Sequence, residues 1–278
     1  MSVVNLLPDL YKLCEMTNQN RDKLIEIHRK MLCEPLQFFF PERSTEEIQF
    51  ELLTNGLFDP DEGLEIDETV KFLEQQGVWQ MLQREFETLR SLWKGPDVPI
   101  YIYPLTKYRP MIDGIEAKKN GITYNGVLFL FVSTDLKEEE LKALLAHEYH
   151  HICRLAYLNK RPEEIELIDS LIIEGMAEAA VEELYGEKRL SPWTKKYVID
   201  DVRMLWEKYF VPALNLKGVQ QHHPFLYGDE CRGLPKWVGY SIGYRIVESY
   251  LKNGGPIPQC LFYQMPSTEI IQKSDFKI

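Results

Sequence analysis

The feature that most constrains this chain is a pair of histidines four residues apart, His147 and His151, with Glu148 directly after the first. The surrounding segment, residues 136–157, contains good helix formers and no glycine or proline, so it predicts a helix. Residues four apart share one face of a helix, and both imidazoles can therefore reach one metal ion. This is the His-Glu-x-x-His zinc pattern, in which the glutamate contacts a metal-bound water rather than the metal.

A zinc ion that keeps one position open for water needs a third protein ligand. The next predicted helix supplies Glu174, which follows three aliphatic residues and precedes Gly175. A carboxylate in so apolar a setting costs free energy unless it is paired, and the metal is the partner already implied. Glu178, one turn later, is a candidate to accept the free ring N–H of a ligand histidine and so to orient the ring. We expect Gly175 to let this helix approach the histidine helix closely, and Glu182 to face water.

The spacing His147-Glu148-x-x-His151 followed by Glu174-x-x-x-Glu178 resembles the gluzincin class of metallopeptidases, the thermolysin-like group. With the later run LPKWVGYSIGY, it is also similar to a bacterial family of predicted zinc-dependent proteases, over about the second half of the chain. The resemblance implies that His147, His151 and Glu174 bind zinc and that Glu148 is the general base. The sequence departs from the thermolysin-like pattern in one place, because the pair on the second helix is Glu/Glu instead of Glu/Asp. This leaves the role of Glu178 less well defined than that of Glu174.

Two tyrosines one helical turn apart, Tyr240 and Tyr244, lie in a predicted helix over residues 235–251. The family likeness favours Tyr240 first and Tyr244 second as a hydroxyl donor to the oxyanion of a peptide carbonyl under attack. Spacing alone leaves both as buried core residues. Elsewhere, His222 and His223 are open candidates as zinc ligands or substrate contacts, against the alternative that they have no catalytic role. A further histidine, His28, is expected at the surface or at the edge of the core.

The chain is expected to be α+β and mostly helical, and the resemblance implies a zincin-like metallopeptidase fold with a small, mainly antiparallel sheet packed on the active-site helix. Residues 1–95 form a helical N-terminal region and residues 96–278 the zincin-like catalytic region, expected to be one integrated unit. Residues 127–133 form either an edge strand that binds peptide by β-augmentation or a fully buried central strand. Other expectations are helices over residues 20–36 and 67–93, and hairpin turns at Asn120-Gly121 and Asn125-Gly126.

The net charge and the cysteine content indicate which binding partners and which cellular compartment are compatible with this chain. The net charge of −11 argues against nucleic acid or an anionic membrane as a partner, because phosphates would be repelled. Five cysteines without C-x-x-C spacing make a disulfide framework improbable, and the first residues lack a secretory-signal pattern. We therefore expect a cytoplasmic protein.

The expected function is zinc-dependent hydrolysis of peptide bonds in a peptide or protein substrate. Zn²⁺ would lower the pKa of its bound water from near 16 toward roughly 7, and Glu148 would accept the proton and later deliver it to the leaving amine. One alternative is a non-catalytic, zinc-stabilised binding or regulatory protein that retains a peptidase-like site. Another is a metal-free helical protein in which the motif occurs by chance.

Overall fold

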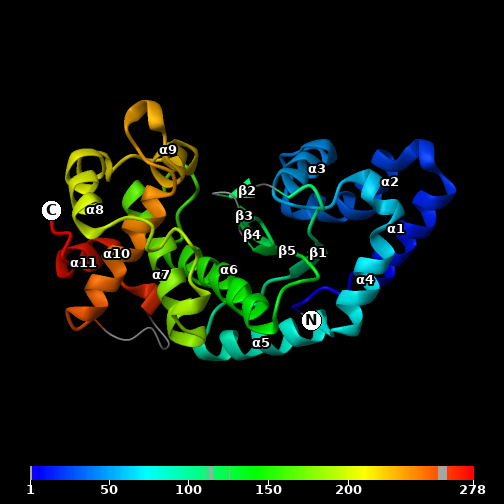
Figure 1. The fold of residues 1–278 in the computed structure, drawn as a ribbon, viewed down its shortest axis with the longest axis horizontal. Coiled ribbons are helices and arrows are strands. Elements are labelled where there is room, and N and C mark those ends of the chain that lie inside the picture. Colours follow the sequence, from blue (N-terminus) through cyan, green and yellow to red (C-terminus); the bar gives the residue numbers. More distant parts are fainter. Residues whose placement is uncertain (1, 110, 113–114, 125, 256–261) are drawn as a thin grey trace. The chain divides into compact units, whose positions relative to one another are not determined.

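The structure is a computed structural model that describes residues 2–109, 111–112, 115–124, 126–255 and 262–278 (Figure 1). It is α+β and mostly helical, as the sequence predicted. The chain divides into two compact units, one formed by Met1–Arg90 and Pro96–Glu148 and the other by Ser91–Gly95 and Tyr149–Ile278. The points of division fall within helices α5 (Val78–Trp93) and α6 (Glu138–Leu158). The predicted boundary after residue 95 stays a prediction.

The first unit begins with helices that pack around a small apolar core. The helix predicted over residues 67–93 is two helices, because Gly77 lies between them with a φ of +65°, a backbone conformation that ends an α-helix. The helix predicted over residues 20–36 is α-helical only from Leu24 to Leu32. The helices here are α1 (Leu7–Gln19), α2 (Leu24–Leu32), α3 (Thr45–Thr54), α4 (Ile66–Gln75) and the greater part of α5.

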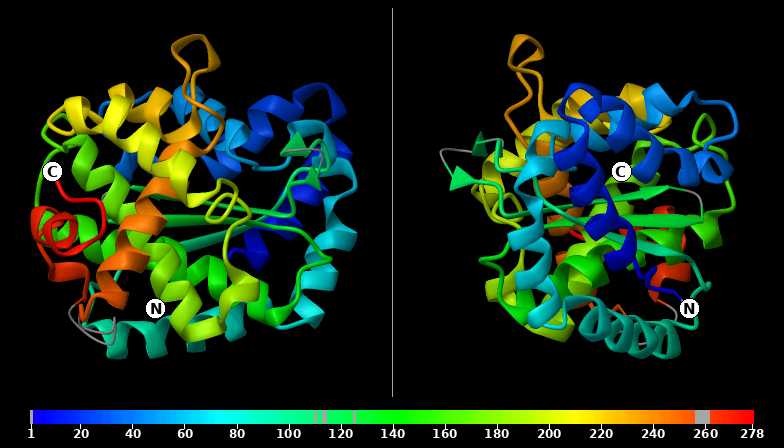
Figure 2. Two further views of the ribbon diagram at one scale, coloured as in Figure 1. Left: turned by 60° about the vertical axis from the view of Figure 1, so that its left-hand side comes forward. Right: turned by 90° about the vertical axis from the view of Figure 1, so that its right-hand side faces the viewer.

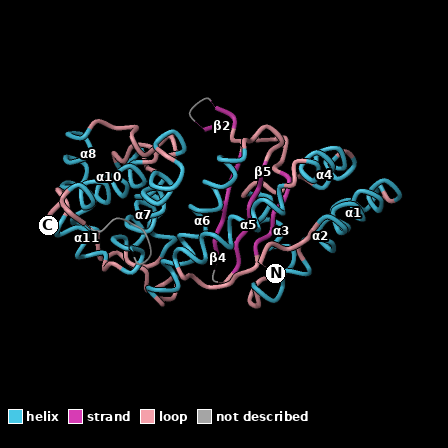
Figure 3. Tube along the Cα trace, turned by 90° about the horizontal axis from the view of Figure 1, so that it is seen from below, coloured by secondary structure: helices cyan, strands magenta, loops and turns pink. Residues whose placement is uncertain are grey.

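A three-stranded mixed sheet lies in the same unit (Figure 3). Its order is β1 (Ile100–Pro104), β5 (Val127–Val132), β4 (Lys119–Tyr124), with β1 parallel and β4 antiparallel to β5. Every residue of β5 is buried and β5 lies between the other two strands, so the central-strand alternative for this run is confirmed. Among the strands described, β1 and β4 are the two edges of this sheet. Two short strands, β2 (Met111–Ile112) and β3 (Ile115–Glu116), pair separately.

The predicted turn at Asn120-Gly121 is wrong, because both residues lie inside β4. The chain reverses between β4 and β5, where Asn125 lies outside the described residues and Gly126 has a φ of +85°. The antiparallel pairing runs without interruption from Lys119 opposite Val132 to Tyr124 opposite Val127. The sheet therefore brings residues of β4 beside the helix that follows β5.

Helix α7 (Leu167–Tyr185) is the interior helix of the second unit. Every residue from Leu167 to Val181 is buried except Glu174, as expected for a helix that is apolar around its whole circumference. The other helices of this unit surround it or follow it, and Figure 2 shows α10, in orange, alongside the yellow-green α7. They are α8 (Ile199–Leu205), α9 (His223–Tyr227), α10 (Val238–Lys252) and α11 (Ser267–Lys273).

Glycines allow α7 and α10 to meet backbone to backbone. A Cβ atom on Gly175 would lie 2.1 Å from the carbonyl oxygen of Gly243, and one on Gly243 would lie 2.2 Å from that of Leu171. The expectation that Gly175 faces the histidine helix is therefore wrong, because its open side is filled by α10. Gly243 thus leaves room for the backbone of α7, and Gly239 leaves room in the same way for the backbone at Phe225 and Leu226.

A buried arginine joins α6 to the start of α7 and to the segment before α11. The Arg154 guanidinium is fully buried and donates to the carbonyls of Tyr263 and Met265 and to Ser267 Oγ, at 2.6 to 2.7 Å. Ser267 Oγ in turn donates to Asp169 Oδ1 at 2.7 Å. These bonds pair both terminal nitrogens of the buried guanidinium and so tie the second half of α6 to the segment around Ser267. Among the described residues, no helix has the length and apolar character needed to span a bilayer.

Candidate metal centre

Helix α6 places two imidazoles on one face. His147 and His151 are separated by one turn, and α6 is helical without interruption from Glu138 to Leu158, so their proximity follows from helix geometry alone. His147 is partly buried and His151 is buried. Ring stacking of Trp93 on Tyr149, with centroids 5.8 Å apart, packs the opposite side of this turn. The helix therefore has one packed side and one side that carries the histidines.

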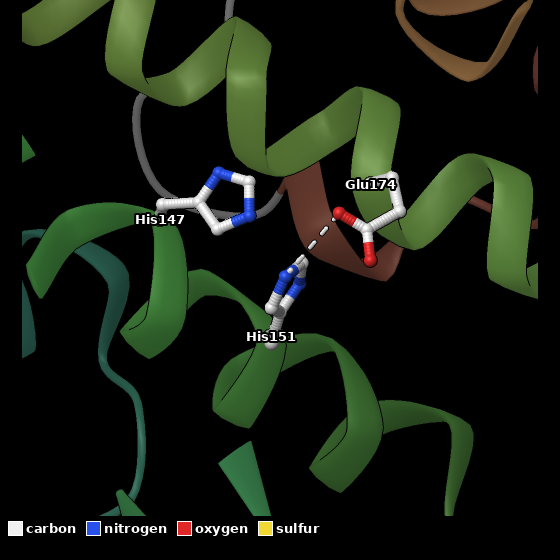
Figure 4. A group of neighbouring side chains, drawn as sticks. All are labelled: His147, His151 and Glu174. Carbon is white, nitrogen blue, oxygen red and sulfur yellow. Dashed lines mark ion pairs between the residues drawn. The ribbon is translucent and has the colours of Figure 1, made fainter. Parts of the chain in front are cut away.

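Helix α7 supplies the carboxylate that meets them (Figure 4). Glu174 Oε2 lies 3.6 Å from His151 Nε2, and the two side chains are only 15% and 10% exposed. One ligand atom from each of His147, His151 and Glu174 lies within 4.8 Å of the other two. Within the described residues, this is the one group of three or more His, Cys, Asp or Glu side chains arranged in this way.

The distances and the chemistry of these donors fit a zinc ion. Zinc in a tetrahedral site lies about 2.0 to 2.2 Å from nitrogen and oxygen ligands, which puts neighbouring ligand atoms roughly 3.3 Å apart. The 3.6 Å between His151 Nε2 and Glu174 Oε2 is within a few tenths of an ångström of that value. Two imidazoles and one carboxylate also form one of the ligand sets of catalytic zinc. The assignment of the three residues as ligands stays a prediction.

Glu148 lies against strand β4. Its side chain is buried, and Thr123 Oγ1 lies 2.9 Å from Glu148 Oε2 and 3.1 Å from the Glu148 carbonyl oxygen. Gly121, two residues earlier on the same strand, is so close that a Cβ there would lie 2.4 Å from Glu148 Cγ. Sequence reasoning missed both contacts. A glycine inside a strand marks a close approach, and this signal was misread as a turn.

The buried Glu178 makes its hydrogen bonds to the chain that follows α7. Its carboxylate accepts from the backbone N–H of Ser191 at 3.0 Å and from the Ser191 hydroxyl at 2.5 Å. These bonds hold the segment after α7 against the helix, one turn beyond Glu174. The predicted contact of Glu178 with a ligand histidine stays a prediction.

The two candidate tyrosines of α10 differ in their surroundings. Tyr244 is fully buried and donates its hydroxyl to Glu182 Oε2 at 2.7 Å, and burial together with this bond raises its pKa. Glu182 is eight residues after Glu174, about 12 Å along the helix axis. Glu182 accepts this hydrogen bond from Tyr244, so the expectation that Glu182 merely faces water is wrong. Tyr240 is partly buried and packs on Trp193, with ring centroids 5.6 Å apart. Because the Tyr244 hydroxyl already donates to Glu182, Tyr240 is the stronger candidate as hydroxyl donor to the oxyanion.

His222 and His223, the two remaining histidine candidates, make contacts with residues of the second unit. His222 is fully buried, with Nδ1 2.8 Å from Ser170 Oγ and Nε2 2.8 Å from the Leu216 carbonyl oxygen. Both ring nitrogens are thus engaged inside the second unit, and burial lowers the pKa of the ring. His223 is exposed and packs on Tyr227, with ring centroids 4.4 Å apart. These contacts favour the alternative in which neither histidine binds zinc.

Comparison with known proteins agrees with this geometry. Residues 78–272 match the family described as "Predicted Zn-dependent protease (DUF2268)". The chain is 36% identical over 185 residues to the uncharacterized protein YjaZ of Bacillus subtilis (strain 168), which covers 66% of this chain and 70% of that protein. It is 29% identical over 123 residues to the uncharacterized protein YjfC of the same strain, covering 40% of each. No solved structure matches. The family match begins at Val78 and is therefore longer than the second half of the chain, over which the resemblance was expected.

Proposed function

This chain belongs to the family of predicted Zn-dependent proteases, and from that premise we propose that it is a gluzincin-type peptidase whose zinc is held by His147, His151 and Glu174. The observation that carries the proposal is the convergence of two imidazole nitrogens and one carboxylate oxygen within 4.8 Å of one another. Zinc bound there would act as a Lewis acid and lower the pKa of a coordinated water.

Glu148 is the general base in this proposal. It follows the first histidine directly, and its carboxylate contacts Gly121 and Thr123 of β4. It accepts the proton of the attacking water and then delivers it to the leaving amine, so that one group serves both halves of the reaction. Glu148 is therefore needed for the rate of hydrolysis and not for retention of the metal.

The substrate is a peptide or protein segment in extended conformation. We assign its binding to the outer edge of β4, because β5 has a strand on each side and, of the two edge strands β1 and β4, β4 is the one that contacts Glu148. Strand β4 carries Gly121 and Thr123 beside Glu148, so a segment paired with it would pass close to the base. The net charge of −11 disfavours nucleic acid and anionic membranes as partners. A cytoplasmic setting belongs to the same proposal.

Digestion of a mixed peptide library, with and without a chelator, tests the proposal. We expect cleavage that the chelator abolishes and added zinc restores. The variant Glu148→Gln should keep about one zinc per chain and lose hydrolysis by at least about a hundredfold, since proton transfer by a positioned base contributes on this scale. His151→Ala should lose both zinc and hydrolysis.

Glu139→Gln is the matched control, because Glu139 is an exposed residue of the same helix. It should retain both zinc and activity. Full activity of Glu148→Gln would refute the assignment of the base. Bound zinc with no cleavage of any peptide would favour the non-catalytic alternative instead.

A further inference from the structure

Strand β4 presents one face to α6. Side chains alternate along a strand, so Lys119, Gly121 and Thr123 share a face, and all three approach α6. Lys119 Nζ lies 3.2 Å from the Glu140 carbonyl oxygen, while Gly121 and Thr123 both meet Glu148. The opposite face makes other contacts, such as the bond from the Asn120 amide to the Asn55 carbonyl oxygen at 2.9 Å. Gly121 and Thr123, which are neighbours on this face of the strand, therefore both contact the Glu148 side chain.

At Gly121 the strand makes room for the carboxylate. A Cβ atom there would lie 2.6 Å from both Cδ and Oε1 of Glu148, in addition to its contact with Cγ. Real Cβ atoms do not approach other atoms so closely, so any larger residue would displace the Glu148 side chain. The carboxylate therefore lies against the strand at Gly121, the one residue of β4 without a side chain.

At Thr123 the strand fixes the rotation of the carboxylate. The hydroxyl has one proton, and its nearer acceptor is Oε2 of Glu148, at 2.9 Å. A hydrogen bond to an ionised oxygen is stronger than one to a neutral carbonyl, so Oε2 is the favoured acceptor while Glu148 is ionised. That bond engages one lone pair of Oε2, whereas Thr123 makes no bond to Oε1, so we take Oε1 as the oxygen that accepts the proton.

We propose that Thr123 is a positioning residue for Glu148: its hydroxyl holds Oε2 so that Oε1 is presented for proton transfer, with Gly121 providing the space. The inference rests on the proposed function, because it concerns the base of that reaction. It assigns no contact between Thr123 and substrate or zinc. Loss of the hydroxyl should therefore slow the chemical step and leave substrate binding and metal content unchanged.

The test compares Thr123→Val, which keeps the shape of the side chain, with Thr123→Ser, which keeps the hydroxyl. For Thr123→Val we expect kcat to fall at least about tenfold, the scale of one hydrogen bond to a charged group, with KM within about twofold. Zinc content should stay at about one per chain. Thr123→Ser should retain kcat within about threefold, because its hydroxyl can make the same bond.

Thr88→Val is the control for the substitution itself, because Thr88 is exposed and its hydroxyl donates to the Arg84 carbonyl oxygen of its own helix. Should Thr123→Val fail to fold by thermal unfolding, Thr123→Ala takes its place with the same expectation. A hydroxyl-free variant with unchanged kcat, beside chelator-sensitive cleavage by the wild type, would overturn this inference and leave the proposed function standing. Absence of cleavage by the wild type would overturn both.

Discussion

His28 lies in the core of the first unit, not at the surface or edge where the sequence pattern placed it. Its side chain is fully buried, with Nε2 3.0 Å from the Phe58 carbonyl oxygen and Nδ1 2.9 Å from the Gln49 amide nitrogen. This arrangement needs the neutral ring, because a protonated Nδ1 would face the amide donor of Gln49. Burial lowers the pKa of His28 to about 4. Both partners are distant in the sequence, so local spacing gave no sign of them.

The free energy of unfolding should depend on the charge of His28. The unfolded chain takes up a proton below pH 6.5, whereas folded His28 stays neutral down to about pH 4, so stability is complete above pH 6.5 and falls between those values. The loss should reach roughly 2 to 3 kcal/mol at about pH 4.5. Urea unfolding of the wild type and His28→Gln, at about pH 7.5 and about pH 4.5, measures it. Equal losses in the two proteins would contradict the prediction.

The residues of the metal site could be predicted from their spacing in the sequence. Contacts that depend on the pairing of strands could not. The histidine spacing and the isolated Glu174 pointed to one metal site, and their ligand atoms do converge. Thr123 precedes Glu148 by 25 residues and meets it only because β4 pairs with β5. Nothing in the sequence specifies that pairing register.

At the scale of elements, two opposed effects decide how a substitution between α7 and α10 changes the free energy of unfolding. Replacing a helical glycine by alanine gains about 1 kcal/mol from propensity, but Gly243→Ala would put a Cβ 2.2 Å from the Leu171 carbonyl oxygen. A backbone oxygen cannot swing aside, so the overpacking cost of about 1 to 3 kcal/mol or more should prevail. Urea unfolding should show a lower free energy of unfolding for Gly243→Ala. The exposed Lys252→Ala, on the same helix, should change it by about 0.5 kcal/mol or less. A stabilised Gly243→Ala would disprove the close contact.

The elements were predicted best where one periodic pattern covers the whole segment. The helix expected over residues 136–157 is α6, with ends one or two residues away. The helix expected over residues 67–93 is interrupted, because Gly77 adopts a positive φ that an amphipathic pattern does not reveal. The apolar run of β5 left edge and central positions open, since the neighbours of a strand are fixed by pairing with distant segments.

For the whole molecule, composition and residue pattern were enough to predict the fold class. The mostly helical α+β class is confirmed. The boundary predicted after residue 95 stays a prediction. The divisions between the compact units fall inside α5 and α6, where a continuous helix leaves no linker for the sequence to show. The family match from Val78 onward includes all of α5, which sequence reasoning had assigned to the N-terminal region.

Zinc content measured by elemental analysis is the most direct test of the central claim that α6 and α7 together hold one metal ion. We predict about one zinc per chain for the wild type and for His223→Ala, whose exposed ring is the matched control, and less than about 0.1 for His151→Ala and Glu174→Ala. Wild-type chain that binds no zinc, or variants of both ligands that keep one zinc per chain, would contradict the account.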